Sequence, residues 1–297
     1  MKNGVIIINK EEGITSQGVV NRVKKLLGVG KAGHTGTLDP MATGVLPVLV
    51  GKGVKASEYM LGSDKHYKAR LMLGITTDTE DITGEILTRT DIIPNEDDVQ
   101  RVVAGMVGEI YQTPPMYSAL KVGGKKLCDL ARAGVTIERE ARKIRINSIE
   151  TEKISDTEYD LTVKCSKGTY IRTLCADIGK ELGVGGVMSA LCRMGAAGFS
   201  LDTAHTLSEL ENMNDEEREA FVLPIEVIFK NERSLTLPPF FAKLARCGLE
   251  IYLKKISFNA ELGERIKLYD ERGFFALGEV REFDTGLAIK PIKQFDT

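Results

Sequence analysis

Residues 28–44 contain the side chains best suited to chemistry. Their sequence, GVGKAGHTGTLDPMATG, is rich in glycine and threonine and holds one acid, Asp39, and one histidine, His34, five residues apart. An ionised carboxylate can act as a nucleophile or a base, and a histidine can carry protons or hydrogen bonds near neutral pH. An aspartate before a proline is also a common turn former, so this segment alone favours a structural role for Asp39.

Two glycine-rich nucleotide-binding motifs are excluded for the same segment. The P-loop pattern GxxxxGK[ST] is absent, because Gly30-Lys31 is followed by Ala32. No GxGxxG opens a helix after a strand, which the dinucleotide-binding fingerprint requires. The segment therefore contains neither of these phosphate-binding loops.

Cysteine usage and hydropathy limit the class of protein. The five cysteines form no CxxC pair and the three histidines are scattered, so the sequence predicts neither a disulfide framework nor a metal site. We interpret the cysteines as small buried hydrophobic residues. No apolar run reaches the length of a membrane span, and the apolar stretch near the N-terminus is too short for a signal peptide. We therefore expect a cytoplasmic protein with no membrane contact.

The net charge of −2 does not decide whether the partner is a nucleic acid. Residues 119–145 hold eight Lys and Arg against three Asp and Glu, whereas residues 76–98 hold eight acids against one base. Binding to a polyanion depends on local basic contacts rather than on total charge. A solvated charged surface is the simpler interpretation of either stretch.

Regular elements flank the segment that holds Asp39. Residues 4–9 (GVIIIN) read as a buried strand, and Thr15 or Ser16 caps an amphipathic helix after it. Residues 28–44 then lose periodicity and predict a long loop, of the kind that is usually functional in a compact domain. Residues 45–51 (VLPVLVG) predict the next strand.

The rest of the chain predicts a mixed α/β domain followed by a β-rich appendage. Further elements are expected as strands at residues 65–73, 143–153 and 158–165 and as helices at residues 97–103 and 170–182. Residues 207–219 are acidic and polar and predict a peripheral excursion. After a compositional break near Lys230, several short strand-like runs are separated by turn residues.

Five segments in order resemble the motifs of the TruB family of tRNA pseudouridine synthases, and the resemblance covers roughly residues 1 to 200. They are GHTGTLDPMATGVLPVLVG (residues 33–51), HYKA (66–69), QTPPMYSALK (112–121), CSKGTYIRTL (165–174) and SALCR (189–193). The resemblance implies that Asp39 is the catalytic carboxylate and that Arg172 is the cation that keeps it charged and in place. A surface arginine in the first turn of a helix is the alternative for Arg172.

The resemblance also implies how a uridine is held. Tyr67 would stack on the extruded base, Leu191 would press on its other side, and Tyr170 would hydrogen-bond within the site. Each of these three could equally be an ordinary core residue. His34 would fill the hole that the flipped uridine leaves in the RNA, with a loop-capping histidine as the alternative. Lys121, Lys125 and Lys126 lie where contacts to the RNA backbone would be useful.

The fold and function that the resemblance implies are as follows. Residues 1–229 form a pseudouridine synthase catalytic domain built on a mixed sheet, and residues 230–297 form a small PUA-like RNA-binding domain. The enzyme isomerises uridine 55 in the T-stem-loop of tRNA to pseudouridine, by base flipping, without a metal, a cofactor or an obligatory protein partner. Whether Asp39 attacks C6 or C1′ or acts as a base stays open.

Three other functions remain as alternatives. A dyskerin-like enzyme of the same fold would depend on a guide RNA, but this chain lacks the long basic tails of the eukaryotic members of that branch. An RNA-binding protein with an inactive site would not retain Asp39, Tyr67 and Arg172 together. A hydrolase that used Asp39 with water would release free uracil and leave an abasic RNA.

Overall fold

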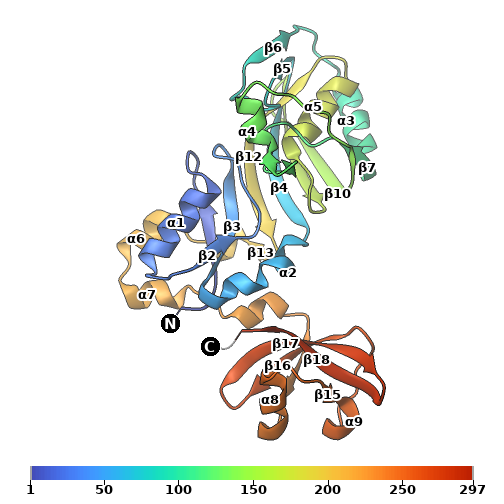
Figure 1. The fold of residues 1–297 in the computed structure, drawn as a ribbon. Coiled ribbons are helices and arrows are strands. Elements are labelled where there is room, and N and C mark those ends of the chain that lie inside the picture. The colour runs from blue at the N-terminus through green and yellow to red at the C-terminus, as the bar shows by residue number, and fades with distance from the viewer. Residues whose placement is uncertain (1, 296–297) are drawn as a thin grey trace.

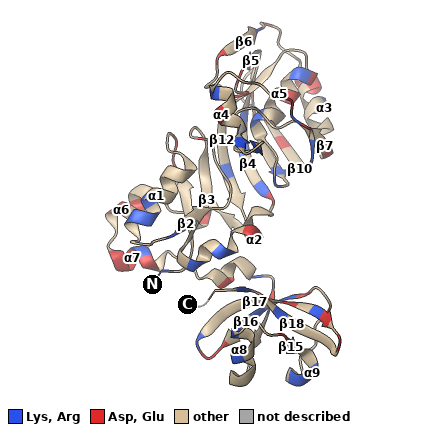
Figure 2. Cartoon of the chain, viewed as in Figure 1, with Lys and Arg blue, Asp and Glu red and all other residues tan. Residues whose placement is uncertain are grey.

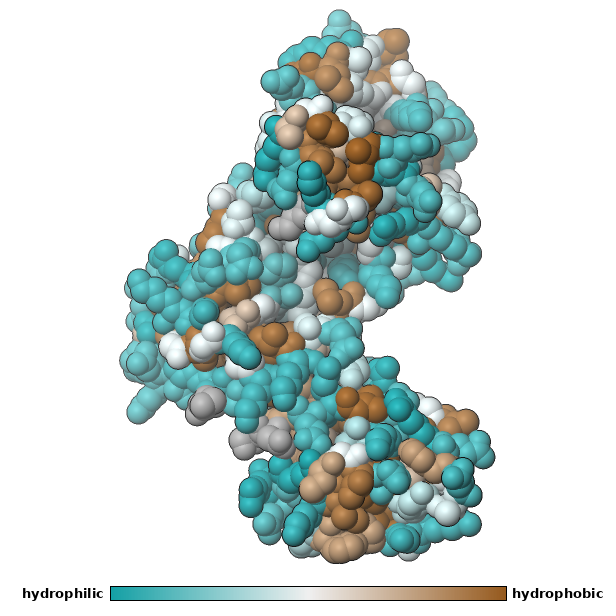
Figure 3. Space-filling model, in the orientation of Figure 1, coloured by the Kyte–Doolittle hydropathy of each residue, from teal (hydrophilic) through white to brown (hydrophobic). Residues whose placement is uncertain are grey.

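The computed structural model describes residues 2–295, with the exception of the side chain of Lys126. The chain is elongated, with a large sheet that runs through the N-terminal part and a separate β-rich domain at the C-terminal end (Figure 1). The space-filling view shows a narrow waist between these two parts (Figure 3).

A nine-stranded mixed sheet organises the N-terminal part. Its strands are β1 (Gly4–Lys10), β2 (Ala32–His34), β3 (Thr43–Val50), β4 (Lys65–Leu73), β7 (Gly108–Gln112), β10 (Arg142–Lys153), β11 (Glu158–Cys165), β12 (Gly186–Ala196) and β13 (Phe199–Ser200). The main order is β1-β3-β12-β4-β11-β10-β7, in which β12 and β3 are parallel and the other pairs antiparallel. The predicted α/β class with a mixed sheet is therefore confirmed.

Helices cover this sheet in two groups (Figure 1). One group is α1 (Ser16–Leu26) with α6 (Leu207–Asn212) and α7 (Asp215–Ala220), and the other is α3 (Glu96–Gly105) with α5 (Ile171–Glu181). The shorter helices are α2 (Ser57–Leu61) and α4 (Leu127–Arg132), together with the 3-10 turns Gly51–Ala56, Leu201–Thr203 and Ile225–Phe229. Two small hairpins pair β5 (Ile75–Thr77) with β6 (Ile86–Arg89) and β8 (Lys121–Val122) with β9 (Lys125–Lys126).

The burial pattern of each strand explains why it forms. In β1 the side chains of Val5 and Ile7 enter one core while Ile6 and Ile8 enter another, so residues 5–8 are all apolar. In β4 alternate residues are buried, since only one face of this part of the sheet is covered by α5. Thr15 caps α1 by accepting a hydrogen bond from the backbone N–H of Gly18 at 2.9 Å.

The C-terminal part has a sheet and a core of its own. Its elements are β14 (Arg233–Thr236), α8 (Pro239–Arg246), β15 (Ile251–Tyr252), α9 (Leu253–Ile256), β16 (Arg265–Asp270), β17 (Gly273–Phe283) and β18 (Gly286–Gln294). The strand order is β14-β16-β17-β18-β15, and the buried residues form a separate cluster with α8 and α9. The predicted β-rich appendage is present, with two helices that the sequence pattern did not indicate.

Aromatic rings join the two parts. Phe229 lies 5.2 Å from Tyr59, 6.0 Å from Phe274 and 5.7 Å from Phe295 between ring centroids. Tyr59 belongs to α2 and Phe274 to β17, so the contact joins helix α2 of the N-terminal part to the C-terminal sheet. An apolar cluster therefore crosses the boundary predicted at residue 230.

Three sequence expectations need correction. Residues 28–44 are not wholly irregular, because residues 32–34 pair with β3 as the short strand β2. The peripheral excursion contains the two short helices α6 and α7, both with capping boxes. Cys165 and Cys175 are buried as expected, but Cys128 and Cys192 are only half-buried and Cys247 is exposed after the end of α8. No helix among the described residues is long and apolar enough to cross a membrane.

Candidate active site

Asp39 lies in the loop between β2 and β3, and its neighbours hold that loop in place. The hydroxyl of Ser16, at the start of α1, donates to the carbonyl oxygen of Leu38 at 2.9 Å and accepts from its N–H at 2.8 Å. The N–H of Ala42 donates to the carbonyl oxygen of Asp39 at 3.1 Å. The side chain of Asp39 keeps 36% of its surface exposed, so a ligand can reach its carboxylate.

Arg172 joins Asp39 to a second carboxylate, Asp81. Its Nε lies 3.0 Å from Oδ2 of Asp39, and Nη1 lies 3.4 Å from Oδ2 of Asp81. The guanidinium also donates to the carbonyl oxygens of Thr79 at 3.0 Å and Tyr117 at 2.7 Å. Only 7% of the Arg172 side chain is exposed, so the alternative of a surface arginine does not describe its position.

Sequence reasoning missed Asp81, which is buried in the turn between β5 and β6. Its carboxylate accepts hydrogen bonds from the N–H of Thr83 at 3.0 Å and the hydroxyl of Thr79 at 2.9 Å. These hydrogen bonds keep the Asp81 carboxylate directed at the Arg172 guanidinium, so the ion pair has a defined geometry. In the sequence Asp81 was one acid within the acidic stretch, which gave no signal to separate it from its neighbours.

The surroundings of the Asp39 carboxyl shift its pKa in both directions. Burial raises the pKa of the Asp39 carboxyl, and the negative charge of Asp81 adds to that rise. The positive charges of Arg172 and Lys10 act in the opposite direction. A partly desolvated carboxylate that stays held by a guanidinium is more basic and more nucleophilic than one in water.

Lys10 is a second residue that sequence reasoning missed, and its side chain contacts the backbone of the Asp39 loop. It is fully buried at the end of β1, and its ammonium donates to the carbonyl oxygens of Pro40 at 3.0 Å and Ala42 at 2.5 Å. Burial lowers the pKa of Lys10 to about 8, and the charge of Asp39 limits the fall. The sequence feature that could have identified Lys10 is its position as a charged residue at the end of a mostly apolar strand.

Tyr67 and Leu191 come from adjacent strands and share a buried cluster. Tyr67 in β4 is 8% exposed and Leu191 in β12 is 9% exposed. The register pairs Tyr67 with Arg193 and Leu191 with Ala69. Burial raises the pKa of the Tyr67 hydroxyl, and Asp39 is among the charges that act on it. Leu38, the residue before Asp39, belongs to the same buried cluster as Tyr67 and Leu191.

Tyr170 is held through its backbone at the start of α5. Gln112, which is buried in β7, accepts from the N–H of Tyr170 at 2.8 Å and donates to its carbonyl oxygen at 3.0 Å. Burial raises the pKa of the Tyr170 hydroxyl, and the charges of Arg172 and Asp39 also act on it. Gln112 is a further residue that the sequence did not single out for this position.

His34 lies in β2, opposite Val48 of β3. Its Nδ1 accepts a long hydrogen bond of 3.4 Å from the N–H of Gly36. Burial, and then the positive charge of Arg193, lower the pKa of His34. The ring is therefore neutral at pH 7, flat and partly accessible.

The candidate RNA contacts lie on the β8–β9 hairpin. Lys121 and Lys125 are exposed, and the register places Lys121 opposite residue 126. The side chain of Lys126 lies outside the part of the chain that the structure describes. Along the ribbon of the described residues, segments with Lys and Arg are interspersed with segments with Asp and Glu (Figure 2).

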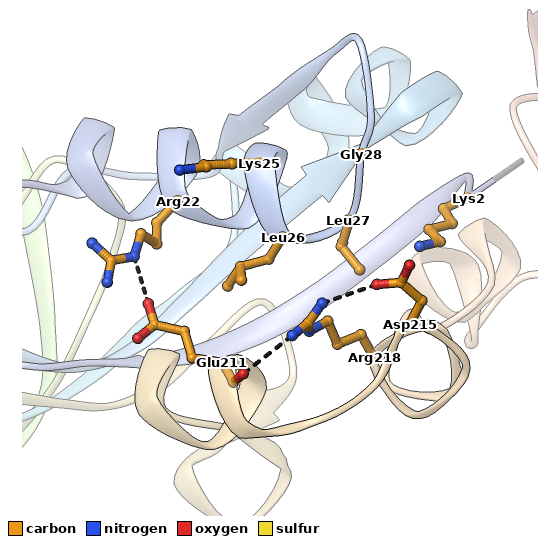
Figure 4. Close-up of a pocket in the computed structure, with 9 residues that line it drawn as sticks. All are labelled: Lys2, Arg22, Lys25, Leu26, Leu27, Gly28, Glu211, Asp215 and Arg218. Atoms are coloured by element: carbon orange, nitrogen blue, oxygen red, sulfur yellow. Dashed lines mark hydrogen bonds and ion pairs between the residues drawn. The ribbon is translucent and has the colours of Figure 1, made fainter.

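A hollow of about 550 Å³ lies elsewhere, between α1 and α6–α7 (Figure 4). Its arginines are already paired, since Arg22 contacts Glu211 and Arg218 contacts Asp215 at 2.9 Å. None of Asp39, Tyr67 and Arg172 lines it. We therefore assign the chemistry to the region of Asp39. Within residues 2–295 no group of three or more His, Cys, Asp or Glu side chains is arranged to hold a metal ion.

Comparison with known proteins identifies the family. Residues 24–171 match the N-terminal domain of the TruB family pseudouridylate synthases, and residues 172–230 match the tRNA pseudouridylate synthase B C-terminal domain. A protein of Alkaliphilus oremlandii named tRNA pseudouridine synthase B is 44% identical over 95% of this chain and 94% of its own length. This chain belongs to the TruB family of pseudouridylate synthases. A Clostridium tetani protein of the same name is 40% identical over 93% of this chain and 95% of its own length.

Solved structures extend the likeness to the whole fold. A chain from a Cbf5–Nop10–Gar1 complex matches with a TM-score of 0.70 and 26% identity, over 99% of this chain and 85% of that one. A chain from an archaeal box H/ACA Nop10–Cbf5 complex matches with a TM-score of 0.70 and 25% identity, over 99% of this chain and 86% of that one. The TruB family is a family of isomerases, and the resemblance found in the five sequence motifs is confirmed.

Proposed function

We propose that this protein isomerises uridine 55 in the T-stem-loop of tRNA to pseudouridine. The observation that carries the proposal is the contact of the partly exposed Asp39 carboxylate with buried Arg172, in a chain whose relatives are named tRNA pseudouridine synthase B. The reaction breaks the N1–C1′ bond, turns the detached uracil, and forms a C5–C1′ bond, with one proton lost from C5 and one gained at N1. The net change neither adds nor removes atoms or electrons, so the chain's own side chains can supply the groups that it needs.

Each site residue has a role in this proposal. Asp39 is the carboxylate that acts on C6, on C1′ or as a base, and Arg172 keeps it ionised and directed. Tyr67 and Leu191 enclose the uracil from two sides, and Tyr170 hydrogen-bonds in the site. These placements suit a flipped nucleotide, because a base that leaves its stack needs a closed pocket of matching shape.

The neutral ring of His34 fills the space that the flipped uridine leaves in the T-loop. Its lowered pKa supports this role, since a neutral ring can stack among bases without carrying a charge into them. Lys121, Lys125 and Lys126 contact the RNA backbone from the β8–β9 hairpin.

In the same proposal, residues 1–229 are the catalytic domain and residues 230–297 a PUA-like domain that binds tRNA away from the site. The separate buried cluster of the C-terminal sheet supports this division. The enzyme works in the cytoplasm on free tRNA, without a guide RNA, a cofactor or another protein.

The test is release of tritium from C5-labelled uridine in an unmodified tRNA transcript, with the purified protein alone. Tritium is released when C5 bonds to C1′, and a transcript with position 55 replaced by cytidine is the control. Activity that needs an added guide RNA would favour the dyskerin-like alternative. Binding without release would indicate an inactive RNA-binding protein, and free uracil with an abasic site would indicate a hydrolase.

A further inference from the structure

Arg193 is a buried cation beside the candidate site for which the proposed roles above give no function. Only 1% of its surface is exposed, and it is among the largest fully buried side chains of the protein. Within the described residues 2–295 no carboxylate forms an ion pair with it. A buried guanidinium without a counter-ion loses its hydration with no opposite charge to offset the loss, so its position calls for an explanation beyond packing.

The partners of Arg193 are backbone carbonyls on both sides of Asp39. Its Nε donates to the carbonyl oxygen of Val45 at 2.7 Å, and Nη2 donates to that of Gly36 at 3.2 Å. One rigid guanidinium therefore bridges the two ends of the loop that carries Asp39. Lys10 contacts two other carbonyls of the same loop, those of Pro40 and Ala42, which lie after Asp39.

The backbone of Arg193 lies between the strand that follows this loop and the strand that carries Tyr67. In the sheet Arg193 pairs with Gly44 of β3 on one side and with Tyr67 of β4 on the other. Gly44 has φ +101°, and a Cβ there would lie 2.3 Å from the carbonyl oxygen of Arg193. Only glycine allows the strands to approach so closely at this point.

The charge of Arg193 also acts on two of the predicted site residues. After burial it is the next cause that lowers the pKa of His34. It also offsets part of the rise that burial causes in the pKa of the Tyr67 hydroxyl. Arg193 therefore acts on the Asp39 loop through its carbonyl contacts, and on His34 and Tyr67 through its charge.

We propose that Arg193 is a positioning residue that sets the geometry of the Asp39 loop relative to Tyr67. This inference rests on the proposed isomerisation of uridine. The buried Arg193 side chain holds the carbonyl groups of Gly36 and Val45, and its backbone pairs with Tyr67 in the sheet. Its loss lets the carboxylate and the stacking ring move apart, and a displacement of about 1 Å costs on the order of 10²-fold in rate.

The experiment compares the single-turnover rate and the tRNA affinity of Arg193→Met, Arg193→Lys and the control Arg70→Met. Arg70 lies on neighbouring β4 and contacts Asp160, which keeps a second contact to Lys68 at 3.1 Å. We expect Arg193→Met to lose about 10²-fold in rate while the Kd for tRNA changes by less than about threefold, since phosphate contacts supply most of the affinity. Arg193→Lys should recover part of the rate, and Arg70→Met should behave as the wild type.

A double-mutant cycle of Arg193→Lys with Tyr67→Leu, a variant whose own rate is expected to fall, decides the matter if Arg193→Met fails to fold. If Arg193 acts through Tyr67, the two losses in rate are not additive. Additive losses, a wild-type rate for Arg193→Lys, or a loss of rate matched by a loss of binding would overturn the inference. A wild-type enzyme that releases no tritium would instead overturn the proposed function, so the two failures can be told apart.

Discussion

The Asp39 loop is held mainly by buried charged groups, whereas the contact between the two domains is mainly aromatic packing. Around the loop, buried charged groups donate to named acceptors: Arg172 to Asp39, Lys10 to Pro40 and Ala42, and Arg193 to Gly36 and Val45. Between the domains, the aromatic rings of residues 59, 229, 274 and 295 pack together. Two partly exposed polar contacts accompany them, Lys293 to Glu58 at 2.6 Å and Lys55 to the carbonyl oxygen of Gln294 at 3.0 Å. Directional bonds fix where an atom lies, whereas apolar contact stabilises association with little directional preference.

This difference predicts where small changes have large consequences. A substitution that preserves shape but alters charge should damage the loop, because its contacts depend on charge and direction. A similar change at the domain contact should cost stability or affinity but leave the chemistry intact. The following variants test that contrast, from the largest expected effect to the smallest.

Asp39→Asn removes the charge and keeps the shape. We expect single-turnover tritium release to fall by at least about 10³-fold while the Kd for tRNA stays within about tenfold, because phosphate contacts dominate binding. Filter binding and tritium release on the same transcript measure both. A rate close to that of the wild type would remove Asp39 from the mechanism.

Asp81→Asn leaves Arg172 with Asp39 as its one carboxylate. We expect the rate at pH 7 to fall by about 10²-fold, because the guanidinium loses the partner that orients it. The negative charge of Asp81 raises the pKa of Asp39, so its removal should also shift the acidic limb of the pH–rate profile to lower pH. Asp78→Asn, in the same turn, is the matched control. An unchanged acidic limb would contradict the coupling of the two carboxylates.

Tyr67→Leu should lower turnover severely, since it removes both the ring and the hydroxyl. Tyr67→Phe separates the two contributions under the same single-turnover conditions. A restored rate assigns the residue to stacking, whereas a rate that stays low assigns the hydroxyl to proton transfer. Equal and near-normal rates for both variants would place the uracil elsewhere.

His34→Ala should slow base flipping more than chemistry. Extruding a stacked base costs a few kcal/mol, so the defect should shrink on a T-arm in which the target uridine is already unstacked. The ratio of single-turnover rates on the two substrates is the measurement. A defect of the same size on both would exclude the role of filling the vacated space.

Ending the chain after Lys230 should have the smallest effect on chemistry. We expect cooperative unfolding and retained turnover, with weaker tRNA binding, because the large sheet and its clusters lie before this point. Loss of two phosphate contacts would make the slope of log K against log salt shallower by about 2, at about 0.9 per contact.

The truncation also exposes Tyr59 and Phe229, so its solubility needs a control. Phe274→Ala in the full-length chain loosens the aromatic contact without removing the domain. Circular dichroism melting and salt-dependent binding on both proteins separate the two effects. A truncated chain without a cooperative transition would show that the boundary divides one folding unit.

Local patterns in the sequence determined the regular elements around the site. The predicted strand at residues 65–73 coincides with β4, and the predicted hairpin at residues 143–165 is the β10–β11 pair. Alternation and helical spacing record which face of an element is buried, and each can be read within about ten residues. The five motifs identified the family, and the glycine-rich segment was found to contain the one acid, Asp39.

Only the tertiary structure decided which charged groups meet. Arg172 contacts Asp81, which lies 91 residues away, because the sheet places β12 and β4 between β3 and β11 and brings α5 against the β5–β6 turn. Lys10, Gln112 and Arg193 carry no periodic signal for their contacts with backbone groups on distant segments. Periodicity encodes burial, but the partner of a buried charge depends on strand order and register, which long-range packing determines.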